Sequence, residues 1–594
     1  MKARSNGVVE MMLMRLISCF ALLSVAAGLV TAHAVAADVP ASAARRFKIP
    51  RAVVAGFIEP RQDPATVAIG ERLFLETRFS QHFFANARGD ANAVLGAGDP
   101  VMATTVTTNR PLPGPFAGHG INCRACHLVN EHRAAGLGHR TYSDYARRSP
   151  VPARGDGQKF TARNTPPMVN STAPREPDLF LHWDGEFVTG DDLVRATLTG
   201  RNLGWLPGER EQAVKHIAHI IRNDDGRGPL AREFGGYSYS HLLAGQDPEL
   251  GEETERFRLP EELRFDVKRA SDVEILDAVA RLISLYTDSL RFSRDERTEY
   301  DSSPYDCFLE TNTLPRRPDP GMTLSYYNRN VQDYVAVLRE PVFVSPTNGF
   351  TPPLNGRFKT LEQKFVFGQV ELLGMKIFFA QARFMTNSAR RPNHGIGNCV
   401  TCHTAPDFSD FKFHNTGVAQ EEYDSLHGAG AFAKLEIPGL AARNADFDRW
   451  LPPTEKHPRA RGPFLGIPAA DRPGRTDLGL WNVFANPDQP RPQPALRRLL
   501  NGDALPQPDD VLLPRTVALF KTPSLRGLAF SGPYLHHGKA DTLEEVIEFY
   551  IRQSRLAREG RVRNGAAELE GIQLKSTDVG PLAAFLRSLN EDYE

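Results

Sequence analysis

The feature that most constrains this chain is a five-residue pattern that occurs twice. Residues 123–127 (CRACH) and 399–403 (CVTCH) both read Cys-x-x-Cys-His. This spacing is typical of c-type haem attachment, in which two thiols bond to the haem vinyl groups and the histidine is a ligand of the iron. A zinc site or a redox dithiol would leave the histidine after each pair without a role. The sequence therefore predicts two covalently bound c-type haems, attached through Cys123, Cys126, Cys399 and Cys402, with His127 and His403 as iron ligands.

The remaining cysteines give no second pair. Of the six cysteines, four lie in the two motifs, Cys19 lies near the N-terminus and Cys307 stands alone. We therefore expect no disulfide in the mature monomer. Cys307 is expected to be a small packed residue.

The N-terminus has the pattern of a secretory signal peptide. Basic residues precede an apolar run from residue 16 to 30, and Ala34-Val35-Ala36 follows as a small-x-small cleavage site. The run is too short to span a bilayer comfortably. Leu16-Ile17-Ser18-Cys19 resembles a lipoprotein cleavage box, but it lies at the start of the apolar run rather than at its end. We expect residues 1–36 to be removed on export to a bacterial periplasm, and we expect no membrane span.

Composition narrows the range of partners. The chain has 594 residues, 71 basic and 71 acidic side chains and no net charge, so nothing favours nucleic acid or anionic lipid as a partner. Hydrophobic residues make up 41% of the chain, enough to fill a core. The 45 prolines and 48 glycines indicate long ordered loops rather than disorder.

The chain also repeats itself. Residues 70–74 (GERLF), the first haem motif and Asn164-Thr165-Pro166 recur in the same order as residues 374–378 (GMKIF), the second haem motif and Lys521-Thr522-Pro523. We interpret this as a duplicated cytochrome-c-like helical unit with one haem per half. The predicted domains are residues 37–295 and 296–594.

Helix signals support a mainly α fold made of two cytochrome-c-like haem domains with long loop insertions. Ser271-Asp272-Val273-Glu274 and Thr542-Leu543-Glu544-Glu545 read as capping boxes that open helices. A last helix carries apolar residues at 582, 585, 586 and 589. Four stretches have weak periodicity and are expected to be loops that cover a site or form an interface: residues 80–120, 205–270, 294–359 and 417–513.

With these motifs in view, the chain resembles the bacterial di-haem cytochrome c peroxidase superfamily, which includes MauG. The resemblance rests on residues 162–166 (ARNTP), 180–185 (FLHWDG), 411–417 (FKFHNTG) and 520–550. In that superfamily one haem keeps an open face, the other is six-coordinate, and a tryptophan lies between them. The resemblance implies that Trp183 is this bridging residue, although an indole packed in a core remains the alternative.

The resemblance also implies a calcium ion between the halves. Its ligands would be Asn164 and the carbonyls of Ser531 and Pro533. Oxygen ligands of this kind suit a hard cation, but turn residues adopt similar arrangements without one.

A sixth ligand of the second iron is implied at Tyr550. In the superfamily this ligand lies fourteen residues after the loop histidine, here His536, and it is methionine in many peroxidases and tyrosine in MauG. Tyr550 shares one helical face with Leu543, Val546 and Ile547, so it is expected to point inward. A phenol bonded to a core carbonyl is the alternative. As a phenolate ligand it would lower the reduction potential of the second haem.

Some positions depart from the peroxidase pattern. Asp156 stands where many members have a switchable distal histidine, and Leu193 and Leu203 stand where they have glutamine and glutamate. Peroxide cleavage needs a positioned base. The candidates that the sequence offers are Glu131, His132, His139, Arg201 and Glu209.

We therefore expect a periplasmic di-haem oxidoreductase that reduces hydrogen peroxide. Its electrons would come from a small redox protein, either a cytochrome c or a cupredoxin, or from a protein substrate. Two alternatives stay open, an oxygenase that activates O₂ at a haem and a non-enzymatic electron carrier with both irons fully ligated. The sequence does not identify the electron donor, the oxidant, the distal base, the role of the insertions or the oligomeric state.

Overall fold

The computed structural model describes residues 63–101, 120–127, 148–173, 175, 178–245, 257–345, 364–384 and 393–590. The described chain is mainly helical and its sheet has two short antiparallel strands, β1 (Phe413–His414) and β2 (Phe520–Lys521). The predicted mainly α fold is confirmed. The expected signal peptide lies outside the described residues. Among the described helices, none combines the length and the apolar character needed to cross a bilayer.

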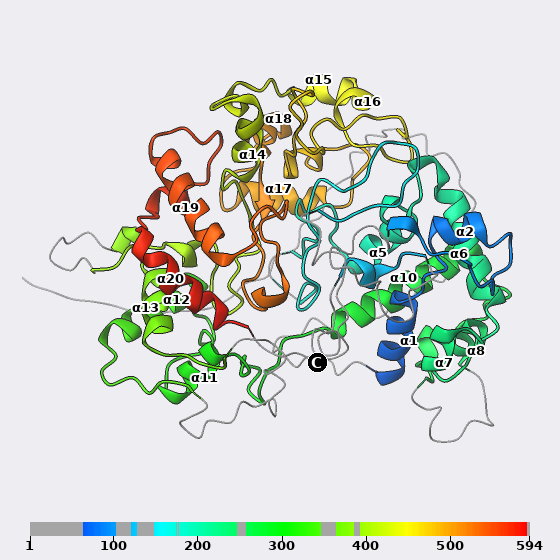
Figure 1. The fold of residues 1–594 in the computed structure, drawn as a ribbon, viewed down its shortest axis with the longest axis horizontal. Coiled ribbons are helices and arrows are strands. Elements are labelled where there is room, and N and C mark those ends of the chain that lie inside the picture. Colours follow the sequence, from blue (N-terminus) through cyan, green and yellow to red (C-terminus); the bar gives the residue numbers. More distant parts are fainter. Residues whose placement is uncertain are drawn as a thin grey trace, which may run out of the picture. The chain divides into compact units, whose positions relative to one another are not determined.

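The helices fall on both sides of a linker near residue 300 (Figure 1). Those before it are α1 (Pro64–Phe74), α2 (Gln81–Asn86), α5 (Gly190–Leu198), α6 (Arg210–Asn223), α7 (Pro229–Glu233), α8 (Tyr239–Ala244) and α10 (Asp272–Ser289). Those after it are α11 (Pro304–Thr311), α12 (Leu324–Val337), α13 (Gln369–Phe379), α14 (Val418–His427), α15 (Leu440–Ala445), α16 (Phe447–Trp450), α17 (Gln493–Asn501), α18 (Asp509–Leu512), α19 (Leu543–Arg558) and α20 (Val579–Arg587).

The same helix crossing occurs in each half. Helix α1 packs against α10, and α13 packs against α20 (Figure 1). Both crossings place a glycine of the sequence repeat at the contact: a Cβ on Gly70 would overlap the Leu282 carbonyl, and one on Gly374 would overlap the Pro581 carbonyl. The absent side chain lets the two backbones approach closely. The repeated GERLF and GMKIF segments thus occupy equivalent places in two helix pairs.

The predicted helix starts are confirmed. Ser271 accepts a hydrogen bond from the Glu274 backbone, and the Glu274 carboxylate accepts one from the Ser271 backbone at 2.8 Å. Thr542 and Glu545 cap α19 in the same way. Each box satisfies backbone N–H groups that the first turn of a helix leaves unpaired. In α20, three of the four predicted apolar residues are buried, and Leu589 is buried just beyond its end.

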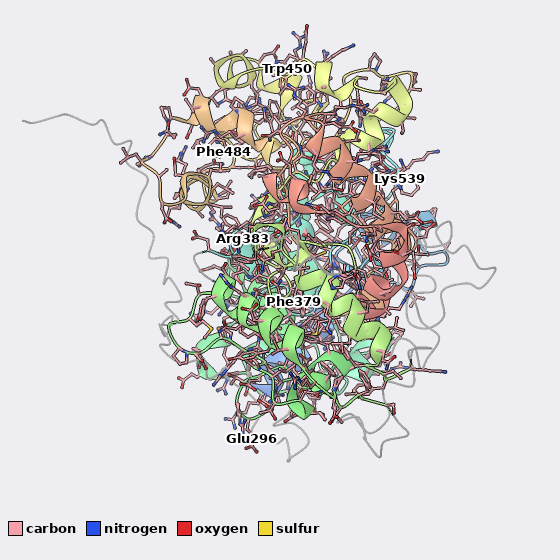
Figure 2. The ribbon with its side chains drawn as sticks, turned by 90° about the vertical axis from the view of Figure 1, so that its left-hand side faces the viewer. Glu296, Phe379, Arg383, Trp450, Phe484 and Lys539 are labelled. Atoms are coloured by element: carbon pink, nitrogen blue, oxygen red, sulfur yellow. The ribbon has the colours of Figure 1, made fainter. Side chains whose placement is uncertain are left out.

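The described residues form three buried apolar clusters rather than two. The first runs from Ile69 to Tyr300 and the second from Tyr305 to Leu589. The third consists of Phe180 and residues between Phe413 and Phe520, including Phe464, Trp481 and Phe484. Figure 2 labels Phe484 and the nearby Trp450 of this region. The segment expected to be a loop insertion therefore has a hydrophobic core of its own.

The prediction of loops for the weakly periodic stretches was wrong in large part. Helices α2, α6, α7, α8, α11, α12 and α14 to α17 lie in these stretches. Most of these helices are short, and four of them, α2, α8, α11 and α12, begin at a Ser or Thr cap. Short helices bury only one or two turns, so their apolar residues do not recur often enough to show a period. Tertiary packing, not local periodicity, stabilises them.

Candidate functional site

Each Cys-x-x-Cys-His motif is attached to the end of the first helix of its half. Asn122, before Cys123, donates to the Leu75 carbonyl just beyond α1 at 2.7 Å and caps the 3₁₀ turn Cys123–Ala125. Asn398, before Cys399, donates through its backbone to the Ala380 carbonyl just beyond α13 at 2.9 Å. An asparagine thus ties each motif to its helix pair.

Both motif histidines are oriented for metal ligation. The Nδ1–H groups of His127 and His403 donate to the carbonyls of Pro166 and Phe408, each at 3.1 Å. A histidine whose Nδ1–H is held in this way presents Nε2 as the ligand atom. Burial lowers the pKa of His127 to about 4, and it also lowers that of His403. Both imidazoles are therefore neutral at pH 7, the form that binds a metal.

The cysteine sulfurs lie in buried surroundings. Burial raises the pKa of Cys123, Cys126 and Cys399 to about 12, and it raises that of Cys402 while the neighbouring His414 opposes the rise. These donor sets fit two c-type haems, because each offers two adjacent thiols and one neutral imidazole. As expected, Cys307 is buried, at 1% exposure, in the second cluster.

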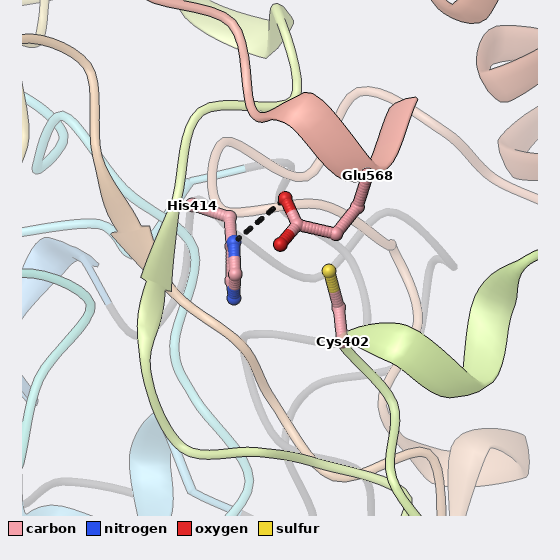
Figure 3. A group of neighbouring side chains, drawn as sticks. All are labelled: Cys402, His414 and Glu568. Atoms are coloured by element: carbon pink, nitrogen blue, oxygen red, sulfur yellow. Dashed lines mark ion pairs between the residues drawn. The ribbon is translucent and has the colours of Figure 1, made fainter. Parts of the chain in front are cut away.

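The second motif has ionisable neighbours that the sequence analysis did not single out. His414, Glu568 and Cys402 lie with their ligand atoms within 4.8 Å of one another (Figure 3). His414 Nε2 donates to the Asp410 carboxylate at 2.8 Å, and its Nδ1 lies 3.8 Å from the Glu568 carboxylate. The spacing of Asp410 and His414 was a signal in the sequence, but position i+4 in a loop does not by itself predict a contact.

Trp183 connects the two repeated Thr-Pro turns. Its indole Nε1–H donates to the Asn164 carbonyl at 2.8 Å, and its own carbonyl accepts from the Lys521 backbone at 2.7 Å. Asn164 begins the turn that holds His127 through Pro166. Lys521 begins the turn whose Pro523 backbone also contacts His403. The tryptophan loop is therefore bonded to the surroundings of both motif histidines.

A buried charge network holds the tryptophan loop. The Arg163 guanidinium pairs with Asp184 at 2.5 Å and with Asp477, in the third cluster region, at 2.6 Å. The Lys521 ammonium donates to the Phe180 carbonyl at 2.9 Å, and burial lowers its pKa to about 7. Trp183 itself packs against the third cluster. The loop is thus fixed from three segments far apart in sequence.

Tyr550 lies on α19 beside the second motif. Burial raises the pKa of its phenol, and the neighbouring Cys402 and Cys399 raise it further. A hydrogen bond with Thr416 opposes that rise. Leu543 and Ile547 on the same face are buried, which agrees with the inward direction expected from the sequence. The placement is compatible with a ligand of the second iron, and the ligand role stays a prediction.

Two of the three expected calcium ligands lie together. The Asn164 amide nitrogen donates to the Pro533 carbonyl at 2.5 Å, while its amide oxygen accepts from the Thr165 backbone at 3.0 Å. The Ser531 hydroxyl donates to the Gly527 carbonyl at 3.0 Å. Calcium would require an oxygen of Asn164 to face Pro533. The ion stays a prediction.

The described candidates for a distal base are engaged in ion pairs. Arg201 pairs with Asp156 at 2.8 Å, and Glu209 pairs with Arg154 at 2.6 Å. Leu203 is buried in the first cluster, and Leu193 packs against it. Glu131, His132 and His139 lie outside the described residues.

Comparisons with known proteins give relatives but no family model, since none matches the chain. Cytochrome-c peroxidase IdrP1 of Denitromonas iodatirespirans is 34% identical over 196 residues, which is 33% of this chain and 38% of the relative. Methylamine utilization protein MauG of Methylorubrum extorquens is 35% identical over 74 residues, 12% of this chain and 19% of that protein. The chain is homologous to cytochrome c peroxidases and to MauG.

The homology covers only part of each relative. The chain spans 37% of cytochrome-c peroxidase IdrP2 of D. iodatirespirans, at 25% identity over 202 residues, or 33% of this chain. Among solved structures, a MauG-like protein associated with microbial copper homeostasis is 17% identical, with a TM-score of 0.41 over 90% of this chain and 91% of that one. The whole activity of the relatives is therefore a matter for proposal.

Proposed function

We propose that the protein is a di-haem c-type oxidoreductase of the peroxidase and MauG type that reduces hydrogen peroxide. The observation that carries the proposal is the pair of equivalent sites joined through Trp183. Each site has a cysteine pair, a neutral histidine held through Nδ1 and a glycine-mediated helix crossing. Trp183 is hydrogen-bonded to the segments next to both histidines. Homology to cytochrome c peroxidases and MauG supports an enzyme rather than a simple carrier.

The chain's own residues would have distinct roles. Cys123 and Cys126 would hold the first haem and Cys399 and Cys402 the second, with His127 and His403 as axial ligands. A haem bound in this way supplies an iron that changes oxidation state and binds peroxide. The Pro166 and Phe408 carbonyls hold the imidazoles in the ligating tautomer.

Trp183 and Tyr550 would make the two halves work as a pair. Trp183 would carry an electron between the halves, because its indole is held by hydrogen bonds from two directions. Tyr550 would be the second axial ligand next to Cys399 and Cys402, so that the second haem is six-coordinate and of low potential. Asn164, Ser531 and Pro533 would hold a calcium ion between the halves.

The electron donor would be a small redox protein, a cytochrome c or a cupredoxin, or a protein substrate. The site of action would be the periplasm, since covalent haem attachment belongs with the exported state that the N-terminal sequence predicts. This part of the proposal rests on the sequence and on the peroxidase relatives.

Consumption of oxidant by the holoprotein tests the proposal. With a reduced small cytochrome as donor, we expect hydrogen peroxide to be consumed under argon with stoichiometric oxidation of the donor. Cys307→Ala serves as a control, because it removes a buried cysteine outside both motifs. O₂ uptake without peroxide consumption would instead favour the oxygenase. Consumption of neither oxidant would leave an electron carrier.

A further inference from the structure

Tyr300 lies in the linker between the two halves and is buried, at 3% exposure. Its phenol donates a short hydrogen bond to the Asp407 carboxylate. The phenol oxygen also accepts hydrogen bonds from the Asn170 amide at 3.0 Å and from the Arg294 guanidinium at 2.9 Å. Every hydrogen-bonding position of the phenol is therefore used, and its proton points at a carboxylate.

The partners of Tyr300 belong to the loops that hold the two motif histidines. Asn170 lies four residues beyond Pro166, whose carbonyl accepts from His127. Asp407 immediately precedes Phe408, whose carbonyl accepts from His403. Tyr300 thus joins the surroundings of both proposed haem ligands at a place distinct from Trp183, which bonds to Asn164 and Lys521 instead.

The surroundings of the ring determine how this phenol can be oxidised. The Arg526 guanidinium lies 3.8 Å from the ring centroid and that of Arg294 lies 4.3 Å from it. Cations this close disfavour a positive charge on the ring. Oxidation would be feasible only if the phenolic proton left together with the electron, because the ring would then stay neutral. Asp407 is the acceptor within hydrogen-bond reach.

Transfer of the proton to Asp407 would leave neighbouring charges compensated. Arg526 has its own bidentate partner, Asp306, with both contacts at 2.9 Å. Neutralising Asp407 therefore does not leave Arg526 as an unpaired buried cation.

We propose that Tyr300 and Asp407 form a proton-coupled redox pair between the two haem-binding halves. The Tyr300 phenol loses one electron to the oxidising equivalent that peroxide leaves in the protein, and its proton moves to the Asp407 carboxylate. The O–H bond breaks at Tyr300 and forms at Asp407, so the ring becomes a neutral radical. An electron from the donor protein, with return of the proton, restores the phenol. This inference depends on the proposed function for its oxidant.

The chain provides a matched comparison five residues away. Tyr305 is also buried, at 1% exposure, but its hydroxyl has no hydrogen-bond partner among the described residues. It packs against Phe367, Phe408 and Phe585. A phenol without an acceptor cannot lose its proton on oxidation, so Tyr305 is expected to be inert.

Freeze-quench EPR of the holoprotein after addition of hydrogen peroxide tests the pair. Protein labelled with ring-deuterated tyrosine identifies the tyrosyl contribution by its narrowed spectrum. We expect a tyrosyl radical in the wild type and in Tyr305→Phe, and its loss in Tyr300→Phe. In Asp407→Asn the phenol is kept but its acceptor is removed, and radical formation should slow by roughly 100-fold or more, the lower end for a positioned proton acceptor.

A second arm replaces peroxide with a ruthenium photo-oxidant, which supplies the oxidant without any peroxide chemistry. If peroxide is not consumed but light produces a tyrosyl radical that Tyr300→Phe removes, the proposed function fails and this inference stands. If the radical has the same yield in Tyr300→Phe and the wild type in this arm, the pair is excluded. A purely structural tie between the two loops predicts that second result, with Tyr300→Phe lowering only the melting temperature.

Discussion

The two haem-binding halves share a framework and differ in what surrounds it. In both, a glycine lets two helices cross, an asparagine ties the motif to the first helix and a carbonyl holds the histidine. Around the second motif, Asp410, His414, Glu568 and Tyr550 lie near the cysteines. Around the first, burial dominates the properties of Cys126 and His127. The framework explains attachment, and the surroundings explain why two equal sites would have unequal roles.

Removing one thiol tests whether the two sites are independent. Cys123→Ala and Cys402→Ala should each disrupt one haem site and leave the other, because each motif is tied to its own helix pair. A pyridine haemochrome assay measures the covalently attached haem per chain, with Cys307→Ala as the control that keeps both. Two normally attached haems in either motif variant would contradict the assignment.

Changing Tyr550 tests the difference between the halves. Tyr550→Phe should open the second haem or change its spin state and raise its reduction potential, because a phenolate oxygen stabilises the oxidised iron. Spectropotentiometry of the holoprotein measures both effects. Tyr534→Phe is the control, since the Tyr534 hydroxyl donates to the Leu528 carbonyl instead. A Tyr550→Phe spectrum and potential equal to the wild type would exclude Tyr550 as a ligand.

The bridge between the halves is tested at Trp183. Trp183→Phe should leave both haem spectra nearly unchanged but slow peroxide-dependent oxidation of the donor by about tenfold, a barrier change of about 1.4 kcal/mol. Trp205→Phe is a matched control, because Trp205 is buried and its indole donates to the Phe79 carbonyl at 3.1 Å. Equal turnover in Trp183→Phe and the wild type would make Trp183 a packing residue.

Acid should act on the first half through Glu76. Burial would raise the pKa of Glu76, but Arg78 outweighs it and the pKa falls from 4.5 to about 2. A lowered folded-state pKa stabilises the protein above pH 4.5, and this contribution is lost as the pH falls to about 2. The contribution is about 3 kcal/mol. Urea unfolding between pH 5 and 2 should lose this part of its pH dependence in Glu76→Gln. An unchanged slope would contradict the pairing.

The shared helix crossing gives the smallest effect. Gly70→Ala and Gly374→Ala should each lower the free energy of unfolding by about 1–3 kcal/mol, because the added methyl group would overlap a backbone carbonyl. Gly580→Ala on α20 is the control: a Cβ there meets nothing within 4 Å. It should be neutral or stabilise by up to about 1 kcal/mol. Chemical denaturation monitored at each haem shows which half is affected.

Local signals in the sequence predicted the elements of the framework. The capping boxes at Ser271 and Thr542 predicted two helix starts correctly, because a cap is a contact within four residues. The third cluster was not predicted. Its aromatic residues, such as Phe464 and Trp481, come together from loops and short helices without a common period.

The site shows the same division between local and distant contacts. The motifs placed the cysteines and histidines, and the helical spacing gave the inward direction of Tyr550. The contact between Tyr300 and Asp407 joins residues 107 positions apart, and that between Arg163 and Asp477 joins residues 314 apart. Neither has a local pattern, so only the folded chain reveals them.

Low-temperature EPR of the oxidised holoprotein tests the inequality of the two halves most directly. The account predicts one high-spin haem from the first site and one low-spin haem from the second in equal amounts. Cys402→Ala should disrupt the low-spin signal, and Tyr550→Phe should change it. Peroxide should diminish the high-spin signal first. Two low-spin haems that do not respond to peroxide would contradict the account and indicate an electron carrier.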